Sequence, residues 1–108
     1  MEMIMREPNT NNSGKAWTRV EIDAVWQKAK TITGYDPDLI RQDACNTWIY
    51  YDEFGTTVKD GVGWEIDHIR PVSQSGNDDL SNLQPLQWEN NRHKADDWPT
   101  WKCAKIAR

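Results

Sequence analysis

Apolar positions in the first part of the chain follow a helical period. Between Val20 and Ala29 they recur at roughly helical spacing, and Thr18 precedes Glu21 in the pattern of a capping box. This pattern predicts a helix over about residues 18–32, ended by the Thr33-Gly34 break.

The middle of the chain combines a second helix start with β-type runs. Asp36-Pro37 is typical of a helix N-terminus and predicts a short helical turn through about residues 41–44. Residues 47–51 are rich in β-branched and aromatic side chains, and turn-forming residues separate them from residues 56–58. We expect these two runs to pair as a hairpin.

The second half predicts the order strand, loop, strand, helix. Residues 64–69 alternate in polarity, residues 82–86 form a second short strand, and residues 87–96 have helical character. A regular strand would place Asp67 and His68 on opposite faces. If these two side chains act together, the strand must end, bulge or twist at about residues 67–69.

Length and composition favour one small α+β domain. The chain has 108 residues with 37% hydrophobic positions, and seven tryptophans supply much apolar area. Residues 1–14 are polar and turn-rich and are expected to form a flexible tail. Residues 15–108 are expected to form a single domain with an N-terminal helix, a β-hairpin and the strand–strand–helix unit.

Charge argues against a general affinity for polyanions. Seventeen acidic and 13 basic residues give a net charge of -4, so no global positive field attracts nucleic acid. Basic residues gather near the start and the end of the chain. Each cluster is as consistent with a solvated helix face as with a phosphate-binding patch.

The two cysteines, Cys45 and Cys103, exclude a four-thiolate zinc site, and no C-x-x-C pair is present. The sequence shows no signal peptide and no apolar stretch long enough to cross a bilayer. We therefore expect a cytoplasmic protein with reduced thiols and no membrane partner, although a bridge between the two cysteines stays open.

Four motifs in the second half occur in a fixed order. They are Asp67-His68-Ile69-x-Pro71, the turn at residues 73–77, the run at residues 79–84, and Asn91-x-x-Lys94. Together, over about residues 62–97, they resemble the HNH endonuclease family and more specifically its Asn-ending (HNN) members. The resemblance implies a ββα-metal finger within the α+β domain.

The resemblance also implies roles for individual residues. His68 would be the general base, and an imidazole with a pKa near 6.5 suits that role. Asp67 and Asn91 would hold one divalent ion, Mg²⁺ or Mn²⁺, because these ions prefer oxygen ligands and keep several waters. Asn82 would support catalysis by bonding across the connecting loop. A structural zinc is not expected.

The closing helix carries the remaining candidates. Lys94 lies on the same helix face as Asn91, whereas His93 lies about 200° away from it. We therefore leave His93 out of the metal site. Lys94 is a candidate for a phosphate or a structural contact, and Arg92 for a nucleic-acid contact.

The sequence thus predicts a divalent-metal-dependent endonuclease that hydrolyses DNA, with RNA as an open alternative. One rival is a non-catalytic nucleic-acid binder on the same scaffold. Another is an accessory nuclease, as in phage packaging, that needs a phage or restriction partner protein. The oligomeric state is left open by the sequence.

Overall fold

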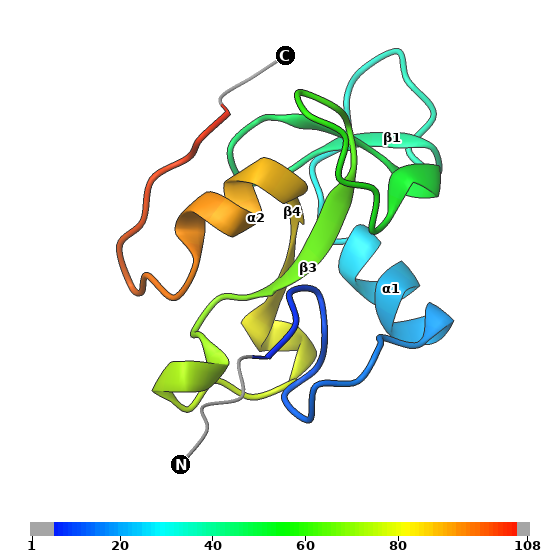
Figure 1. Cartoon of the computed structure of the whole chain (residues 1–108). Coiled ribbons are helices and arrows are strands. Elements are labelled where there is room, and N and C mark those ends of the chain that lie inside the picture. Colours follow the sequence, from blue (N-terminus) through cyan, green and yellow to red (C-terminus); the bar gives the residue numbers. More distant parts are fainter. Residues whose placement is uncertain (1–5, 106–108) are drawn as a thin grey trace.

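The centre of the fold is an antiparallel pair of strands with a helix on either side (Figure 1). The computed structural model describes residues 6–105, in which β3 (Trp64–His68) pairs with β4 (Leu83–Gln87). α1 (Arg19–Trp26) contacts β4, and α2 (Trp88–Lys94) contacts both strands. A second pair contains β1 (Ile40–Gln42) and β2 (Trp48–Tyr50). The predicted α+β fold class is confirmed.

Three short 3-10 helices complete the regular structure of the described part, at Tyr51–Glu53, Val72–Gln74 and Leu80–Asn82. Between residues 6 and 105, every helix is too short or too polar to cross a bilayer.

α1 begins where the sequence predicts and ends early. Thr18 caps it, with Thr18 and Glu21 making both hydrogen bonds of the capping box. The helix ends at Trp26, before the predicted end near residue 32. The buried guanidinium of Arg41 donates to the carbonyl oxygens of Gln27 and Ala29, both at 3.2 Å. A tertiary contact therefore supplies the partners that a continuing helix would have given these carbonyls.

The region after α1 differs from the prediction. A single turn at Asp36, with Ile40 N donating to Asp36 O at 2.9 Å, leads directly into β1 rather than into helix through residue 44. β2 pairs with β1, in the register Arg41 to Ile49, and not with residues 56–58. Both the helical turn through residues 41–44 and the predicted hairpin partner are therefore wrong.

The connection between β1 and β2 explains this outcome. One carboxylate oxygen of Asp43 accepts from the backbone N–H groups of Cys45 and Thr47, at 2.8 and 2.9 Å. Asn46 adopts the left-handed conformation, with φ of 62°. These side-chain bonds close a tight hairpin over the segment that was predicted to be helical.

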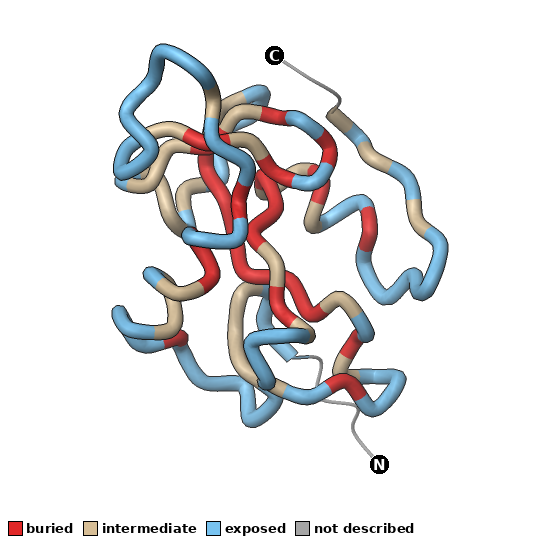
Figure 2. Tube along the Cα trace, turned by 180° about the vertical axis from the view of Figure 1, so that it is seen from behind, coloured by how far each residue is buried: buried red, intermediate tan, exposed pale blue. Residues whose placement is uncertain are grey.

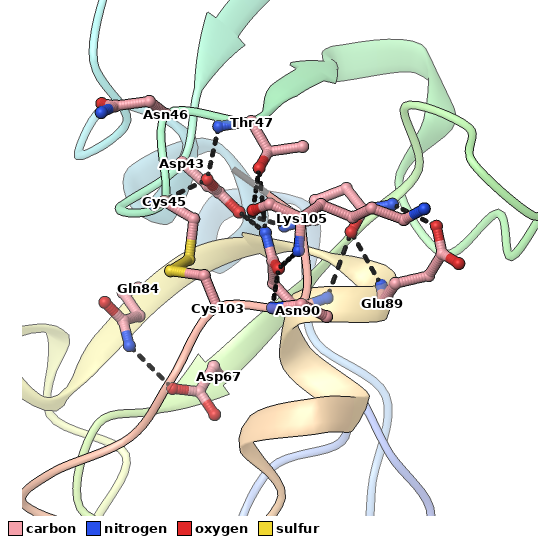
Figure 3. The surroundings of a disulfide bond; sticks show 12 residues. Asp43, Cys45, Asn46, Thr47, Asp67, Gln84, Glu89, Asn90, Cys103 and Lys105 are labelled. Carbon is pink, nitrogen blue, oxygen red and sulfur yellow. Dashed lines mark hydrogen bonds between the residues drawn. A yellow bond between two sulfur atoms is a disulfide. The ribbon is translucent and has the colours of Figure 1, made fainter. Parts of the chain in front are cut away.

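A disulfide joins Cys45 to Cys103 and fixes the C-terminal segment to this connection (Figure 3). The amide oxygen of Asn90 accepts from the backbone N–H groups of Ala104 and Lys105, at 2.8 and 2.6 Å. The expectation of reduced thiols is therefore wrong for this structure. The segment after α2 is attached both covalently and by hydrogen bonds.

β3 is buried along its whole length (Figure 2). Trp64 and Ile66 pack into the hydrophobic core together with Val25, Trp26 and Ile49. The alternate side chains of β3 face α2, where they meet polar partners. The polar face of β3 therefore lies inside the protein. Burying polar side chains costs folding free energy, so their presence here is more consistent with a functional role than with a contribution to stability.

The N-terminal segment lies against the outer edge of β3. The side-chain oxygen of Asn9 accepts from Ile66 N at 2.8 Å, and Asn12 N donates to Asp78 at 3.0 Å. Residues 1–5 of the predicted flexible tail lie outside the described residues. The mobility of the tail stays a prediction, but residues 9–12 have defined partners.

Candidate active site

The last two residues of β3 bring two predicted site residues to one cavity. Asp67 pairs with Gln84 and His68 with Leu83, and the strand ends at His68. Asp67 faces α2, whereas the His68 ring lies against Trp17 with ring centroids 5.6 Å apart. Although the two side chains diverge by strand periodicity, both line the same cavity at the end of the ladder.

The cavity has a volume of about 260 Å³, enough for a phosphate group with several waters. Asn91 reaches it from α2, so the three side chains predicted to form the site share one cavity. The N-terminal segment supplies a further wall. The lining residues outside β3 and α2 include Arg6, Pro8, Asn9, Pro71, Ala95 and Asp96.

Asp67 is a buried carboxylate with two side-chain partners. Its Oδ2 accepts from Gln84 Nε2 at 2.9 Å (Figure 3). Its Oδ1 lies 3.3 Å from Lys94 Nζ. Burial raises the pKa of Asp67, although the hydrogen bond from Gln84 and the charge of Lys94 act in the opposite direction. The carboxylate thus lies in a poorly solvated site with one cation and one amide as its side-chain partners.

Asn91 and Arg92 both bind Glu65, which lies two residues before Asp67 on the same face of β3. Asn91 Nδ2 donates to Glu65 Oε1 at 2.9 Å. The Arg92 guanidinium grips the same carboxylate through two bonds of 3.0 and 2.8 Å, and the hydrogen bond to Glu65 is the main reason the pKa of Arg92 is raised. Within residues 6–105 the amide oxygen of Asn91 accepts no hydrogen bond, so it is available to a ligand.

Asn82 links the two ends of the loop between β3 and β4. Its amide oxygen accepts from Arg70 N at 2.9 Å, and its amide nitrogen donates to the carbonyl oxygens of Arg70 and Asn77 at 3.1 and 2.8 Å. The amide thus uses both its donor and its acceptor capacity. It holds the chain that follows His68 and does not line the cavity.

His68 has its own carboxylate partner. Its Nε2 lies 2.8 Å from Asp78 Oδ1, and its side chain is only 3% exposed. Asp78 belongs to the loop between the strands, and its carboxylate also accepts from Asn12 N. The imidazole therefore lies between the Trp17 ring and an anchored carboxylate.

The cations near the cavity differ in how fully they are paired. Lys94 is completely buried, donating to Asp67 and to the carbonyl oxygen of His68, so of its two predicted roles it has the structural contact. Arg92 is paired with Glu65. Arg6, by contrast, donates to the backbone and hydroxyl oxygens of Thr10, at 2.7 and 3.1 Å, which are neutral partners.

Three of these residues were missed by the sequence analysis. Glu65 could have been found, because strand periodicity places it on the face of Asp67. Asp78 and Arg6 gave no such signal. Asp78 lies in a polar loop beside the similar Asp79, and Arg6 lies in a segment without any periodic pattern.

The donor set fits an open site for one oxygen-preferring ion. Among residues 6–105, no three His, Cys, Asp or Glu side chains are grouped as metal ligands. The cavity nevertheless contains the buried Asp67 carboxylate and the Asn91 amide oxygen, which accepts no hydrogen bond from residues 6–105. Two protein oxygens with most of the coordination shell left to water and substrate are how Mg²⁺ is usually bound.

β3, β4 and α2 form a strand–strand–helix unit, and an imidazole, a carboxylate and an amide from this unit line one cavity. The HNH endonuclease family model matches residues 55–97, which include β3, β4 and α2. The match over this segment supports the predicted resemblance to the HNH endonuclease family. α1 and the β1–β2 pair lie outside the match. Comparisons with curated proteins and with solved structures found no match.

Proposed function

We propose that this protein is a divalent-metal-dependent endonuclease that hydrolyses phosphodiester bonds in DNA. The observation that carries the proposal is the convergence of Asp67, His68 and Asn91 on one cavity within the HNH segment. Their chemical types match the needs of the reaction, which are a proton acceptor for water and oxygen ligands for a cation.

His68 acts as the general base. The imidazole takes a proton from a water molecule as the water oxygen attacks the phosphorus atom. The bond between phosphorus and the 3′ oxygen breaks, and this oxygen leaves with a proton from solvent. The products are a 5′-phosphate and a 3′-hydroxyl end.

Asp67 and Asn91 are the residues that would hold the divalent ion, Mg²⁺ or Mn²⁺. When bound, the ion supplies charge stabilisation for the phosphate and the leaving oxygen. Lys94 holds the Asp67 carboxylate in place. Glu65 accepts a hydrogen bond from the amide nitrogen of Asn91, which leaves the amide oxygen of Asn91 for the ion. Asn82 fixes the chain after His68, and the cation of Arg6, which has neutral partners, is suited to bind the substrate backbone. Arg92 also lines the cavity, but its charge is paired with Glu65.

Plasmid nicking with Mg²⁺ or Mn²⁺ tests this function. Wild type should convert supercoiled plasmid to the open circle, and His68→Ala should lose about 10²-fold or more of the rate. His93→Ala is the matched control, because His93 is exposed on α2 and does not line the cavity. Equal rates for wild type and His68→Ala would remove His68 from the mechanism.

An accessory nuclease that needs a partner protein is the alternative with some support. The net charge of -4 and the pairing of Arg92 with Glu65 leave little free positive charge for DNA. This alternative predicts that cutting appears only when the partner is added. A purely DNA-binding role predicts metal-independent binding without any cutting.

The cytoplasm stays the proposed location, although disulfides are more common in oxidising compartments.

A further inference from the structure

We infer that Asp78 is the positioning residue of His68, fixing the imidazole as the tautomer with its proton on Nε2. The inference rests on the proposed function, because it assigns to the other ring nitrogen, Nδ1, the task of accepting the proton from water. Asp78 lies within the family segment, but the sequence analysis gave it no role.

The geometry supports a fixed pair rather than a chance contact. His68 Nε2 and Asp78 Oδ1 are 2.8 Å apart, and the His68 side chain is 3% exposed. The Asp78 carboxylate is itself held from a second side, since Asn12 N donates to Oδ1 and Oδ2 at 3.0 and 3.3 Å. The segment before α1 thus anchors the carboxylate that contacts the imidazole.

The loop that carries Asp78 is also restrained. Asn82 donates to the carbonyl oxygen of Asn77 at 2.8 Å, and Asn82 N donates to the carbonyl oxygen of Asp79 at 2.7 Å. The residues on either side of Asp78 are therefore tied to Asn82, which directly precedes β4. This arrangement links Asn82 to His68 through Asp78 as well as through the backbone.

Hydrogen-bond chemistry then decides the tautomer. An ionised carboxylate only accepts hydrogen bonds, so the nitrogen that faces it must carry the proton. In a neutral imidazole the other nitrogen then has the lone pair. Among the described residues, no group donates to Nδ1 of His68, and the Trp17 ring limits rotation of the imidazole. Nδ1 is therefore the atom that can take a proton.

The two carboxylates next to His68 have separate tasks. The Asp67 side chain lies on the face of β3 opposite to His68 and is bound by Lys94 and Gln84. It therefore does not orient the imidazole. Asp78 contacts the imidazole and does not line the cavity. One acid is available to a metal ion, and the other holds the base.

Nitrogen NMR of the metal-free protein tests the tautomer directly. Long-range ¹H–¹⁵N spectra at a pH of about 8, where histidine is mostly neutral, distinguish the two tautomers. Wild type should show His68 with the proton on Nε2, and Asp78→Ala should show a mixture of tautomers. Asp79→Ala is the matched control and should leave the His68 signals unchanged, because no side-chain contact joins Asp79 to His68. Wild type protonated on Nδ1, or an Asp78→Ala spectrum identical to wild type, would overturn the inference.

Cleavage kinetics provide the second readout. Asp78→Ala should lower kcat by about 10- to 100-fold with little change in KM, because the base loses its orientation while DNA contacts persist. Asp78→Glu should recover part of the loss, whereas Asp78→Asn should recover less. Unchanged kcat in Asp78→Ala contradicts the inference and leaves the nuclease proposal intact. If wild type does not cut DNA, the nuclease proposal fails, and the tautomer spectra still decide whether Asp78 sets the proton position.

Discussion

Lys94 Nζ lies 3.3 Å from Asp67 Oδ1 inside the protein, with the Lys94 side chain completely buried. The same ammonium group donates to the carbonyl oxygen of His68 at 3.1 Å. α2 therefore contributes a cation to the end of β3 that carries both predicted site residues. The cost of burying this charge is offset only while Asp67 is ionised beside it.

Removing the Lys94 charge should destabilise the protein severely. Lys94→Met keeps much of the side-chain volume but leaves Asp67 buried without its cation, which should cost about 3–5 kcal/mol. Urea unfolding of the metal-free protein measures the change. Lys59→Met, at an exposed position, should unfold like wild type. In the double variant Asp67→Asn, Lys94→Met, the loss should be smaller than the sum of the single losses, and simple additivity would contradict the coupling.

The second half of the fold was more predictable than the first. β3, β4 and α2 each have a local pattern that agrees with their tertiary place, so sequence periodicity found them. β1 was not predicted because its three residues are stabilised by contacts with other parts of the chain and not by a local pattern. These contacts are made with β2, with Lys30 and with the end of α1. The decisive local signal was the Asp43 to Thr47 turn with Asn46 in the left-handed conformation.

The sequence selected the three main candidate residues of the site but not their partners. The motif spacing identified Asp67, His68 and Asn91, which line one cavity. It could not identify Arg6, because that residue reaches the cavity through contacts made far along the chain. The helical period correctly placed Lys94 on the same face of the helix as Asn91. The sequence did not show that Lys94 is buried and binds Asp67.

Arg6 should contribute to DNA binding through one phosphate contact. Arg6 lines the cavity, and its guanidinium has neutral hydrogen-bond partners, so its charge is available to a phosphate. Arg6→Gln should weaken binding severalfold and reduce the slope of log K against log salt by about 1. Fluorescence anisotropy with labelled DNA and Ca²⁺ measures both. Lys15→Gln, an exposed change in the same segment, should have a smaller effect, and an equal effect of the two variants would reduce Arg6 to a general electrostatic role.

The Cys45–Cys103 disulfide should contribute measurably to stability. It closes a long loop, with 58 residues of sequence separation, and constrains the unfolded chain. Reduction should lower the free energy of unfolding by about 2–4 kcal/mol in urea. The double variant Cys45→Ser, Cys103→Ser should match reduced wild type and be insensitive to reductant. A thiol titration of denatured, unreduced protein checks the bond first, since two free thiols would contradict it.

Metal affinity should depend on pH through Asp67. The ion binds the ionised carboxylate, so protons compete with it, and the raised pKa of Asp67 means that competition begins at a higher pH than for an exposed aspartate near 3.9. Calorimetric titration with Mn²⁺ should therefore show affinity falling as the pH is lowered toward that raised pKa. The same series in His68→Ala removes the neighbouring imidazole and isolates the contribution of Asp67. Asp67→Asn should abolish binding in this range, whereas a constant affinity in His68→Ala down to a pH of about 4 would exclude Asp67 as a ligand.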